Sequence, residues 1–384
     1  MELTELLMKA VNMGASDIHL KAGHPPFFRI NGELIPQTEY DPLGPSDVAR
    51  LAYQKIMNER QRDYFMEHHE IDMALGLPGI GRFRVNIFQQ RGSVAIALRV
   101  IPYEIRGFEE LNLPVKPLER LSQELRGLVL VTGPAGVGKS TTLAAMIEYI
   151  NTHRRCHIIT IEDPVEYLFR DKLSIISQRE VRVDTKSFLD ALKMALREDP
   201  DVIMVGEMRD FETINTVLLA AETGHLVLST LHTIDATETI NRIISVYPPH
   251  HQRQVRLQLA NVLRGVISQR LLPRADGNGR VPAVEILINT PRVKECIIDR
   301  EKTAEIPRAI AEGYVVYGSQ TFDQSLMWLY KRKLITLDEA LRHCSNPDEF
   351  VLRVKGILGT SSMGWEVFET QEGLKASGEE DEEF

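Results

Sequence analysis

One segment of eight residues constrains what this chain can fold into more than any other. It reads Gly133-Pro134-Ala135-Gly136-Val137-Gly138-Lys139-Ser140. The segment follows the apolar run 128–131, and a helical pattern begins at Thr141. A strand, a glycine-rich turn and a helix in this order form a loop whose backbone N–H groups face a phosphate, and the helix N-terminus adds positive potential. The segment therefore predicts a phosphate-binding loop in an α/β domain.

The side chains of this loop indicate a nucleoside triphosphate and a divalent cation. Lys139 is expected to reach the β- and γ-phosphates of ATP, and Ser140 is expected to bind Mg²⁺. We include Thr141 among the nucleotide-binding positions because it opens the helix. The alternative is a chance match in a structural glycine-rich turn, and the flanking strand and helix argue against it.

Short apolar runs recur after Gly127 and alternate with helical segments. The runs are 128–131, 158–161, 202–205 and 226–228. Continuous rather than alternating apolarity is typical of strands that are buried on both faces, as in a parallel sheet covered by helices.

The run at 202–205 is followed by Gly206 and Glu207. In many phosphate-loop enzymes the strand at this place ends in an aspartate, so Gly206-Glu207 is an atypical version. Ligands of α/β sheets bind at the carboxyl ends of the strands. We expect Glu207 to hold the Mg²⁺ water shell or to position the attacking water; the alternative is a solvated loop carboxylate.

A second acidic group, Glu162-Asp163-Pro164-Val165-Glu166, follows the run at 158–161. Glu162 is a candidate general base or water-orienting residue. Its importance depends on its position, and we expect its strand to adjoin the strand of the phosphate loop.

Two histidines bracket the run at 226–228. His225 precedes it and His232 follows it. A lone histidine is usually a structural residue, but two around one strand favour a phosphate sensor or a contact between subunits.

The amino-acid composition narrows the classes of protein to which the chain can belong. The chain has 384 residues, 43% hydrophobic and 26% charged, with a net charge of −9, and no apolar run approaches the roughly 18 residues of a membrane span. Three widely spaced cysteines argue against a disulfide framework or a four-cysteine zinc site. The acidic balance disfavours a nucleic-acid translocase, which stays an alternative. We expect a cytoplasmic protein.

The chain divides into five predicted regions. Residues 1–100 form a mixed α/β module with helices over about 4–13 and 46–68 and with hairpins around Asn31-Gly32 and Arg91-Gly92. Residues 101–125 contain three prolines and are interpreted as a linker. The remaining regions are an ATPase core over 126–290, helices over 291–358, and a disordered acidic tail over 359–384.

Together these features resemble the secretion ATPase superfamily of type II secretion and type IV pilus systems, and within it the retraction ATPases of the PilT/PilU family. The resemblance is carried by the phosphate loop, by 159–167, by 199–210 and by 223–233, with 14–20 and 81–86 near the N-terminus. It extends from residue 1 to about 355.

The resemblance implies a PAS-like N-terminal domain, a RecA-like ATPase domain with C-terminal helices, and a homohexamer with ATP at domain and subunit boundaries. It implies that N-terminal arginines reach the phosphates, for which Arg82, Arg84 and Arg99 are the candidates. Arg82 and Arg84 are two apart on a strand and therefore share a face; a solvent-exposed, salt-bridged face is the alternative. The implied partners are an inner-membrane pilus platform protein and a paralogous retraction ATPase, with no nucleic acid.

Two departures bear on the type of motor. Extension and secretion relatives carry a CxxC…CxxC module that this chain lacks, which favours retraction over the alternatives of pilus assembly and type II secretion. The retraction motif of PilT keeps only its amphipathic skeleton here, at 292–301. This favours a PilU-like accessory motor and leaves autonomous retraction open. A further alternative is a regulatory, non-catalytic ring member that binds ATP and modulates a sister motor.

Overall fold

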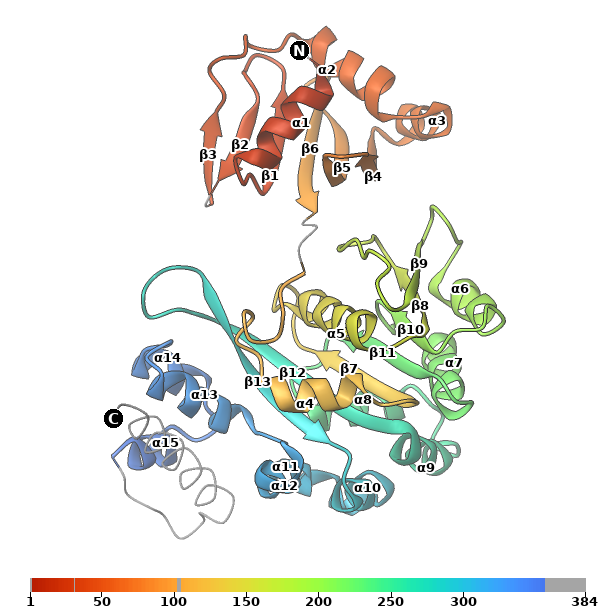
Figure 1. Ribbon diagram of the computed structural model, residues 1–384, viewed down its shortest axis with the longest axis vertical. Helices are drawn as coiled ribbons and strands as arrows, with labels where there is room; N and C mark the ends of the chain where they lie inside the picture. The colour runs from red at the N-terminus through yellow and green to blue at the C-terminus, as the bar shows by residue number, and fades with distance from the viewer. Residues whose placement is uncertain (1, 31, 102–104, 356–384) are drawn as a thin grey trace. The chain divides into compact units, whose positions relative to one another are not determined.

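The structure is a computed structural model that describes residues 2–30, 32–101 and 105–355 (Figure 1). The chain forms two compact units. The first contains the residues before Ile105 together with Glu166–Phe169, and the second contains Ile105–Val165 and the residues from Arg170 onward. Each unit has a hydrophobic core of its own.

The first unit is an antiparallel sheet covered by helices. Its strand order is β3-β2-β1-β6-β5-β4. The strands are β1 (Asp17–Lys21), β2 (Phe27–Ile30), β3 (Glu33–Pro36), β4 (Glu70–Leu77), β5 (Gly81–Gln90) and β6 (Ser93–Ile101). Both predicted hairpins are present, as β2–β3 and β5–β6. Along β5, buried Phe83 and Val85 alternate with Arg82 and Arg84, so one face of the strand enters the core and the other carries the arginines.

One of the two helices predicted for this unit is interrupted in the structure. Helix α1 spans Leu3–Asn12, but the expected helix over 46–68 consists of α2 (Pro45–Arg50), a π-helical stretch (Leu51–Ile56) and α3 (Glu59–His68). Asn58 causes the break, because its side chain accepts from the backbone N–H of Gln61 while the Gln61 side chain accepts from the backbone N–H of Asn58. This reciprocal capping box starts a new helix.

The second unit contains the predicted parallel sheet. Its strand order is β13-β12-β7-β11-β10-β8-β9, and every pair is parallel except β12–β13. The strands are β7 (Gly127–Thr132), β8 (His157–Glu162), β9 (Ile175–Glu180), β10 (Val202–Val205), β11 (Leu226–Leu231), β12 (Leu263–Pro273) and β13 (Arg280–Ile288). Strands β7, β10 and β11 are buried throughout, as continuous apolarity predicts.

Helices cover both faces of this sheet (Figure 1). The core on one face joins the sheet to α6 (Phe188–Ala195), α7 (Phe211–Glu222), α8 (Ala236–Ser245) and α9 (Gln252–Val262). Helix α5 (Lys139–His153) contacts β7 and β11 from the other face and packs against α4 (Val115–Ser122).

The interpretation of 101–125 as a linker is wrong for its second half. Helix α4 occupies Val115–Ser122, and its Leu118 and Leu121 are buried in the second unit. A Cβ atom on Gly265 of β12 would lie 2.8 Å from Leu121, so the helix packs closely on the sheet. Three prolines suggested a linker, but Pro114 and Pro117 lie at the N-cap and in the first turn, where a helix tolerates them.

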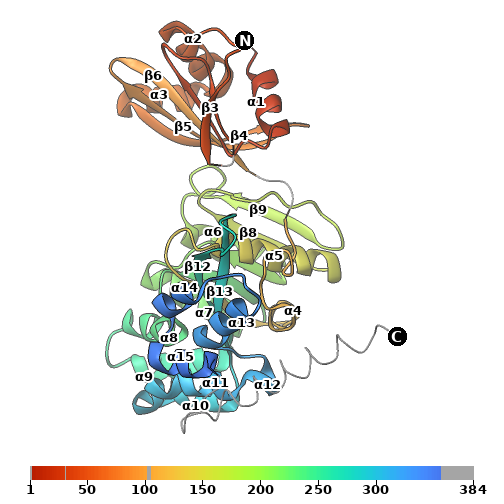
Figure 2. The same ribbon diagram turned by 90° about the vertical axis from the view of Figure 1, so that its left-hand side faces the viewer.

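The helices expected after Thr290 are present. They are α10 (Pro291–Ile298), a 3₁₀ helix (Arg300–Glu305), α11 (Ile306–Glu312), α12 (Tyr314–Tyr317), α13 (Phe322–Lys331), α14 (Leu337–His343) and α15 (Pro347–Val354). Helices α13 to α15 share a core with β12 and β13 (Figure 2). The predicted acidic tail, 359–384, lies outside the described residues.

Candidate active site

The glycine-rich segment forms an open loop between β7 and α5. Gly136 and Gly138 have φ angles of 78° and 95°, which residues other than glycine rarely adopt. A Cβ atom added to either glycine would meet no atom within 4 Å, whereas one on Gly133 would lie 2.6 Å from the carbonyl oxygen of Gln269. The rim of the loop is therefore open to a ligand, while its base is packed against β12.

Lys139 supplies a buried positive charge inside this loop. Its side chain is only 8% exposed, and its Nζ atom donates to the carbonyl oxygens of Gly133 and Pro134, each at 2.8 Å. Ser140 and Thr141 are half-buried in the first turn of α5, where backbone N–H groups have no partner within the helix. An ammonium group, a helix N-terminus and glycine N–H groups together are a donor set that fits the phosphates of ATP.

Polar bonds attach the base of the loop to β12. The Thr132 hydroxyl donates to Ser268 Oγ at 3.0 Å, and Gln269 Nε2 donates to Thr142 Oγ1 at 2.7 Å. These bonds hold the residues on either side of the loop, so the cradle is fixed before a ligand enters.

Glu162 lies at the end of β8, and the order of the strands corrects its expected position. Strand β8 does not adjoin the strand of the phosphate loop, because β11 and β10 lie between them. The carboxylate is 7% exposed and accepts from Thr160 Oγ1 at 2.7 Å and from Gln178 Nε2 at 3.1 Å. Glu162 is thus a well-oriented carboxylate that is separated from the phosphate loop by the ends of two strands.

Glu207 and His232 come together at the ends of the neighbouring strands β10 and β11. His232 Nε2 lies 3.7 Å from Glu207 Oε2, and Arg209 Nε lies 2.7 Å from Glu207 Oε1. The segment before Glu207 is attached to β11 by the Thr230 hydroxyl, which donates to the carbonyl oxygen of Gly206 at 2.6 Å. Because β11 also pairs with β7, His232 follows a strand adjacent to that of the phosphate loop.

His225 lies at the opposite end of β11 from His232, where the strand begins. It precedes β11, whose first residue Leu226 pairs with Gly127 at the start of β7, and its Nδ1 is 2.9 Å from the carbonyl oxygen of Ala220. The structure therefore does not bring His225 and His232 into one site within a chain. A contact of His225 between subunits stays a prediction.

The three arginines belong to the first unit and share one face of its sheet. Arg84 of β5 is the cross-strand partner of Arg99 of β6, and Arg82 is two residues from Arg84. Arg99 Nε also lies 2.8 Å from Asp17 Oδ1. Burial acts to raise the pKa of Asp17, but hydrogen bonds from Arg99 and Ser16 outweigh it and hold the pKa below its usual value. Arg99 thus forms an ion pair of the kind expected for a salt-bridged surface, which is the alternative to a contact with the phosphates.

Sequence reasoning missed the residues that orient the carboxylates. Thr160 lies two residues before Glu162 on the same strand face, so strand periodicity could have identified it. Arg209 lies two residues after Glu207, but both residues follow the end of β10, so strand periodicity gives no signal there. Gln178 had no such signal, because β9 was not predicted.

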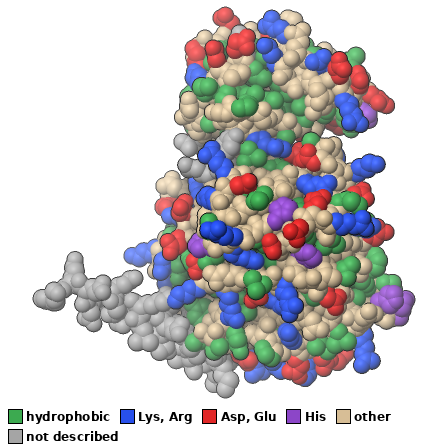
Figure 3. Space-filling model, turned by 45° about the vertical axis from the view of Figure 1, so that its right-hand side comes forward, with side chains coloured by type: hydrophobic (Ala, Val, Ile, Leu, Met, Phe, Trp, Pro, Cys, Tyr) green, Lys and Arg blue, Asp and Glu red, His purple; other side chains and the backbone are tan. Residues whose placement is uncertain are grey.

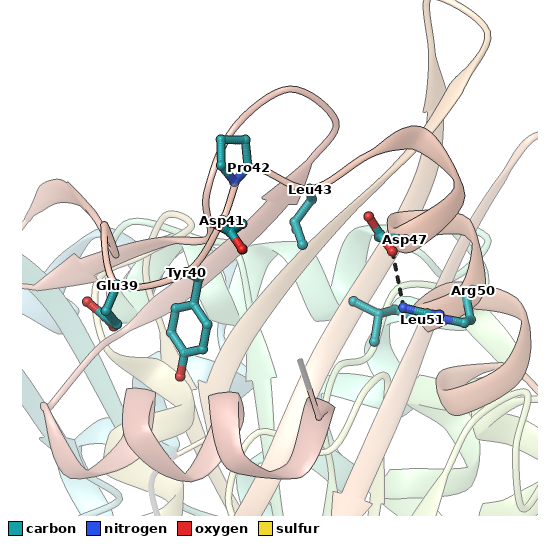
Figure 4. Close-up of a pocket in the computed structure, with 8 residues that line it drawn as sticks. All are labelled: Glu39, Tyr40, Asp41, Pro42, Leu43, Asp47, Arg50 and Leu51. Atoms are coloured by element: carbon teal, nitrogen blue, oxygen red, sulfur yellow. Dashed lines mark hydrogen bonds and ion pairs between the residues drawn. The ribbon is translucent and has the colours of Figure 1, made fainter.

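Two further observations concern the rest of the molecule. Within the described ranges, no helix is long and apolar enough to cross a membrane. A pocket of about 250 Å³ lies in the first unit between β3 and α2, with an Asp47–Arg50 ion pair of 3.1 Å at one side (Figure 4). It contains none of the candidate site residues.

Comparison with known proteins defines the family. The family model described as type II/IV secretion system protein matches residues 2–316. The chain belongs to this family. Type IV pilus retractation ATPase PilT of Pseudomonas aeruginosa is 45% identical over 350 residues, which cover 91% of this chain and 100% of that protein. Type IV pilus ATPase PilU of the same organism is 42% identical over 362 residues, covering 94% and 93%.

Solved structures that resemble this chain agree with the fold. The pilus retraction motor PilT with bound ADP superimposes with a TM-score of 0.83 at 50% identity, and the match covers 91% of this chain and 98% of that chain. The ATPase DotB of Legionella pneumophila gives a TM-score of 0.72 at 26% identity, covering 92% and 95%. The expected mixed α/β fold, with an N-terminal domain, an ATPase domain and C-terminal helices, is confirmed.

Proposed function

We propose that this chain is an ATP-hydrolysing motor of type IV pilus retraction. The observation that carries the proposal is the phosphate loop of β7 and α5 with buried Lys139 at its centre, in a chain that matches a pilus retraction ATPase along that protein's whole length. The Glu207–His232 pair beside the loop supports hydrolysis rather than nucleotide binding alone.

In this proposal the chain's own residues hold and align the reactants. The loop N–H groups and Lys139 bind the β- and γ-phosphates, and Ser140 and Glu207 would hold Mg²⁺, which prefers a few protein oxygens together with phosphate. When bound, Mg²⁺ supplies neutralising charge for the phosphates. Glu207 and Glu162 orient the attacking water, and His232 senses whether the γ-phosphate is present.

The arginines act on a neighbouring subunit in this proposal. In a homohexamer, Arg82, Arg84 and Arg99 of one subunit reach the phosphates held by the next, where a guanidinium can be worth about 10³–10⁵ in turnover. Loss of the γ-phosphate then removes these contacts and lets the rigid units rotate, which is a hinge closure in physical terms.

The proposed setting is the cytoplasmic side of the inner membrane. The partners are the pilus platform protein and a paralogous retraction ATPase, and the family relatives PilT and PilU are pilus ATPases. Nucleic acid is not a proposed partner. The net charge is −9, and acidic and basic side chains are interspersed on the face drawn in Figure 3.

An accessory, PilU-like role is favoured by α10. Its Val293, Cys296 and Ile297 are buried, whereas Arg292 and Glu295 form exposed ion pairs with each other and with Glu305 and Lys302. The helix thus keeps the amphipathic skeleton of the retraction motif with different exposed side chains. Addition of a paralogous motor to the purified protein tests this role: a sharp rise in ATP turnover supports it, and unchanged turnover contradicts it.

The main experiment has a biochemical and a cellular part. Lys139→Ala should abolish ATP hydrolysis by the purified protein, whereas Lys193→Ala, at an exposed position of α6, should not. Deletion of the gene should leave hyperpiliated cells without surface motility. Cells without pili would instead indicate assembly, and full ATPase activity of Lys139→Ala would refute the proposed site.

A further inference from the structure

We propose that Glu285 is a positioning residue of the candidate active site, which fixes the loop carrying His232 through the N-terminus of α8. The proposal rests on the proposed function, since His232 matters only if the site hydrolyses ATP. Glu285 lies on β13, outside every sequence segment that suggested a role in nucleotide chemistry.

Glu285 makes a direct bond to the first residue of α8. Its side chain is 7% exposed, and its Oε1 accepts from the backbone N–H of Ala236 at 2.8 Å. Asp235, the N-cap residue, separately accepts from the N–H of Glu238 at 2.7 Å. The N-terminus of α8 is therefore held from two sides, once by its own cap and once by the β13 carboxylate.

A row of residues across the sheet connects Glu285 to the phosphate loop. Leu231, Thr132, Ser268 and Glu285 are cross-strand neighbours on β11, β7, β12 and β13. The Thr132 hydroxyl donates to Ser268 Oγ at 3.0 Å, and Ser268 in turn hydrogen-bonds the Glu285 carboxylate. Thr132 immediately precedes Gly133, and Leu231 immediately precedes His232. The row thus joins the starts of both loops of the site to one buried carboxylate.

The loop after His232 cannot shift independently of α8. The Thr233 and Thr239 hydroxyls are 2.6 Å apart, Thr239 Oγ1 donates to the Asp235 carbonyl at 2.7 Å, and the Ile234 N–H donates to Glu238 Oε2 at 2.8 Å. Thr233 is 5% exposed and Thr239 fully buried. A change in the position of the first turn of α8 is therefore transmitted to His232 and to its 3.7 Å contact with Glu207.

The alternative is a purely structural role of Glu285, and three substitutions separate this role from positioning of the active site. Glu285→Gln keeps an oxygen that can accept from Ala236, and it matches the protonated acid, since burial raises the pKa of Glu285 to about 7. Glu285→Met keeps an unbranched side chain without an acceptor. Thr239→Val has nearly the same shape and removes the Thr233–Thr239 hydrogen bond without changing Glu285, while the Ile234–Glu238 bond between loop and helix remains.

The experiment measures steady-state ATP hydrolysis and ADP affinity of the full-length protein. For Glu285→Met and Thr239→Val we expect kcat to fall about tenfold, with KM and ADP affinity within about twofold, because a small misplacement of an active-site group reduces the chemical step. Glu285→Gln should retain kcat within about twofold of wild type. Equal kcat for wild type, Glu285→Met and Thr239→Val would overturn the proposal.

Combination with His232→Ala supplies a readout that a structural role would not move. If Glu285 acts through His232, adding Glu285→Met to His232→Ala should reduce kcat little further, because coupled residues are non-additive. Independent, multiplicative losses would overturn the proposal, as would a fall in ADP affinity that accounts for the lost turnover. If Glu285→Met does not fold, the same comparison with Thr239→Val decides. Failure of the proposed function is recognised separately, by a wild-type protein that does not hydrolyse ATP.

Discussion

His232 Nε2 lies 3.7 Å from Glu207 Oε2, although the two residues follow different strands of the sheet. The carboxylate has a side-chain exposure of 16% and is also bound by Arg209, whereas the histidine side chain is 52% exposed. Glu207 is therefore largely buried and paired with Arg209, whose own side chain is 75% exposed, and about half of the His232 side chain is open to solvent. This arrangement suits a carboxylate that orients the attacking water and a histidine that contacts the γ-phosphate.

Glu207→Gln is expected to separate hydrolysis from binding. Removal of the charge should lower kcat by about 10²–10³, the range seen when one preorganised polar group is removed from an active site, while ATP still binds to the phosphate loop. Turnover and nucleotide affinity of the purified protein measure the two effects. Glu212→Gln, at an exposed position in the first turn of α7, is the matched control and should behave as wild type.

Two glycines of the phosphate loop should respond to alanine in different ways. At Gly136 a Cβ meets nothing within 4 Å, so Gly136→Ala should cost only about 1 kcal/mol of stability for its positive φ but should obstruct the phosphate. At Gly133 a Cβ would lie 2.6 Å from the Gln269 carbonyl oxygen, so Gly133→Ala should mainly destabilise the fold. Thermal unfolding and nucleotide affinity distinguish them; the opposite pattern would contradict an open rim and a packed base.

Local patterns were sufficient for the phosphate loop and for the strands buried on both faces. The positive φ angles of the loop glycines and the bonds of Lys139 to Gly133 and Pro134 involve nearby residues, and a strand buried on both faces leaves a continuous apolar run in the sequence, so both features could be predicted. The order of the strands could not, because it depends on long-range pairing. For this reason the sequence predicted Glu162 beside the phosphate loop, whereas two strands lie between them.

The β12–β13 hairpin was missed for a related reason. Its residues alternate polar and apolar only in part, because Ser268, Gln269 and Glu285 are buried through bonds to distant residues. Buried polar residues of this kind look like surface positions in a sequence. Glu285 therefore carried no signal before its partners on α8 and β12 were known.

The misinterpreted linker provides a stability prediction with an internal control. Leu121 of α4 is buried and packs against β12, so Leu121→Ala should reduce the free energy of unfolding by about 2–5 kcal/mol. Leu125, in the same expected linker, is 74% exposed, and Leu125→Ala should change it by at most about 0.5 kcal/mol. Denaturant titration measures both. Equal small effects would mean that the segment behaves as the linker first expected.

Glu285 should make stability depend on pH in a direction opposite to most carboxylates. Its pKa is raised to about 7 chiefly by burial, with Asp235 adding to the rise and the Ala236 N–H and Arg270 opposing it. Between the unfolded pKa and about 7 the folded state holds more protons, so the free energy of unfolding falls as pH rises. Glutamine does not ionise, so the free energy of unfolding of Glu285→Gln should not fall in this way. The difference in stability between Glu285→Gln and wild type should therefore shift in favour of the variant from pH 5 to pH 8, by at most about 3 kcal/mol. Parallel stability curves for the two proteins would contradict the raised pKa.

The arginine face of the first unit yields a test of sharing between subunits. Arg84→Ala protein keeps its phosphate loop but cannot supply that guanidinium, whereas Lys139→Ala protein keeps Arg84 but has a disabled loop. Each alone should have little ATPase activity. If Arg84 acts on the neighbouring subunit, mixed rings contain interfaces with an intact loop on one side and an intact Arg84 on the other, so mixing should restore part of the activity.

A site completed within one chain predicts the opposite result, because no subunit of the mixture would hold both groups. Arg50 provides the matched control: it is an exposed arginine of the same unit, it lies on α2 rather than on β5 or β6, and it pairs with Asp47 of its own helix at 3.1 Å. Arg50→Ala protein should be active alone, and mixing it with Lys139→Ala protein should dilute activity rather than create it. Activity that appears only in the Arg84→Ala and Lys139→Ala mixture therefore identifies both the shared site and the side chain that crosses between subunits.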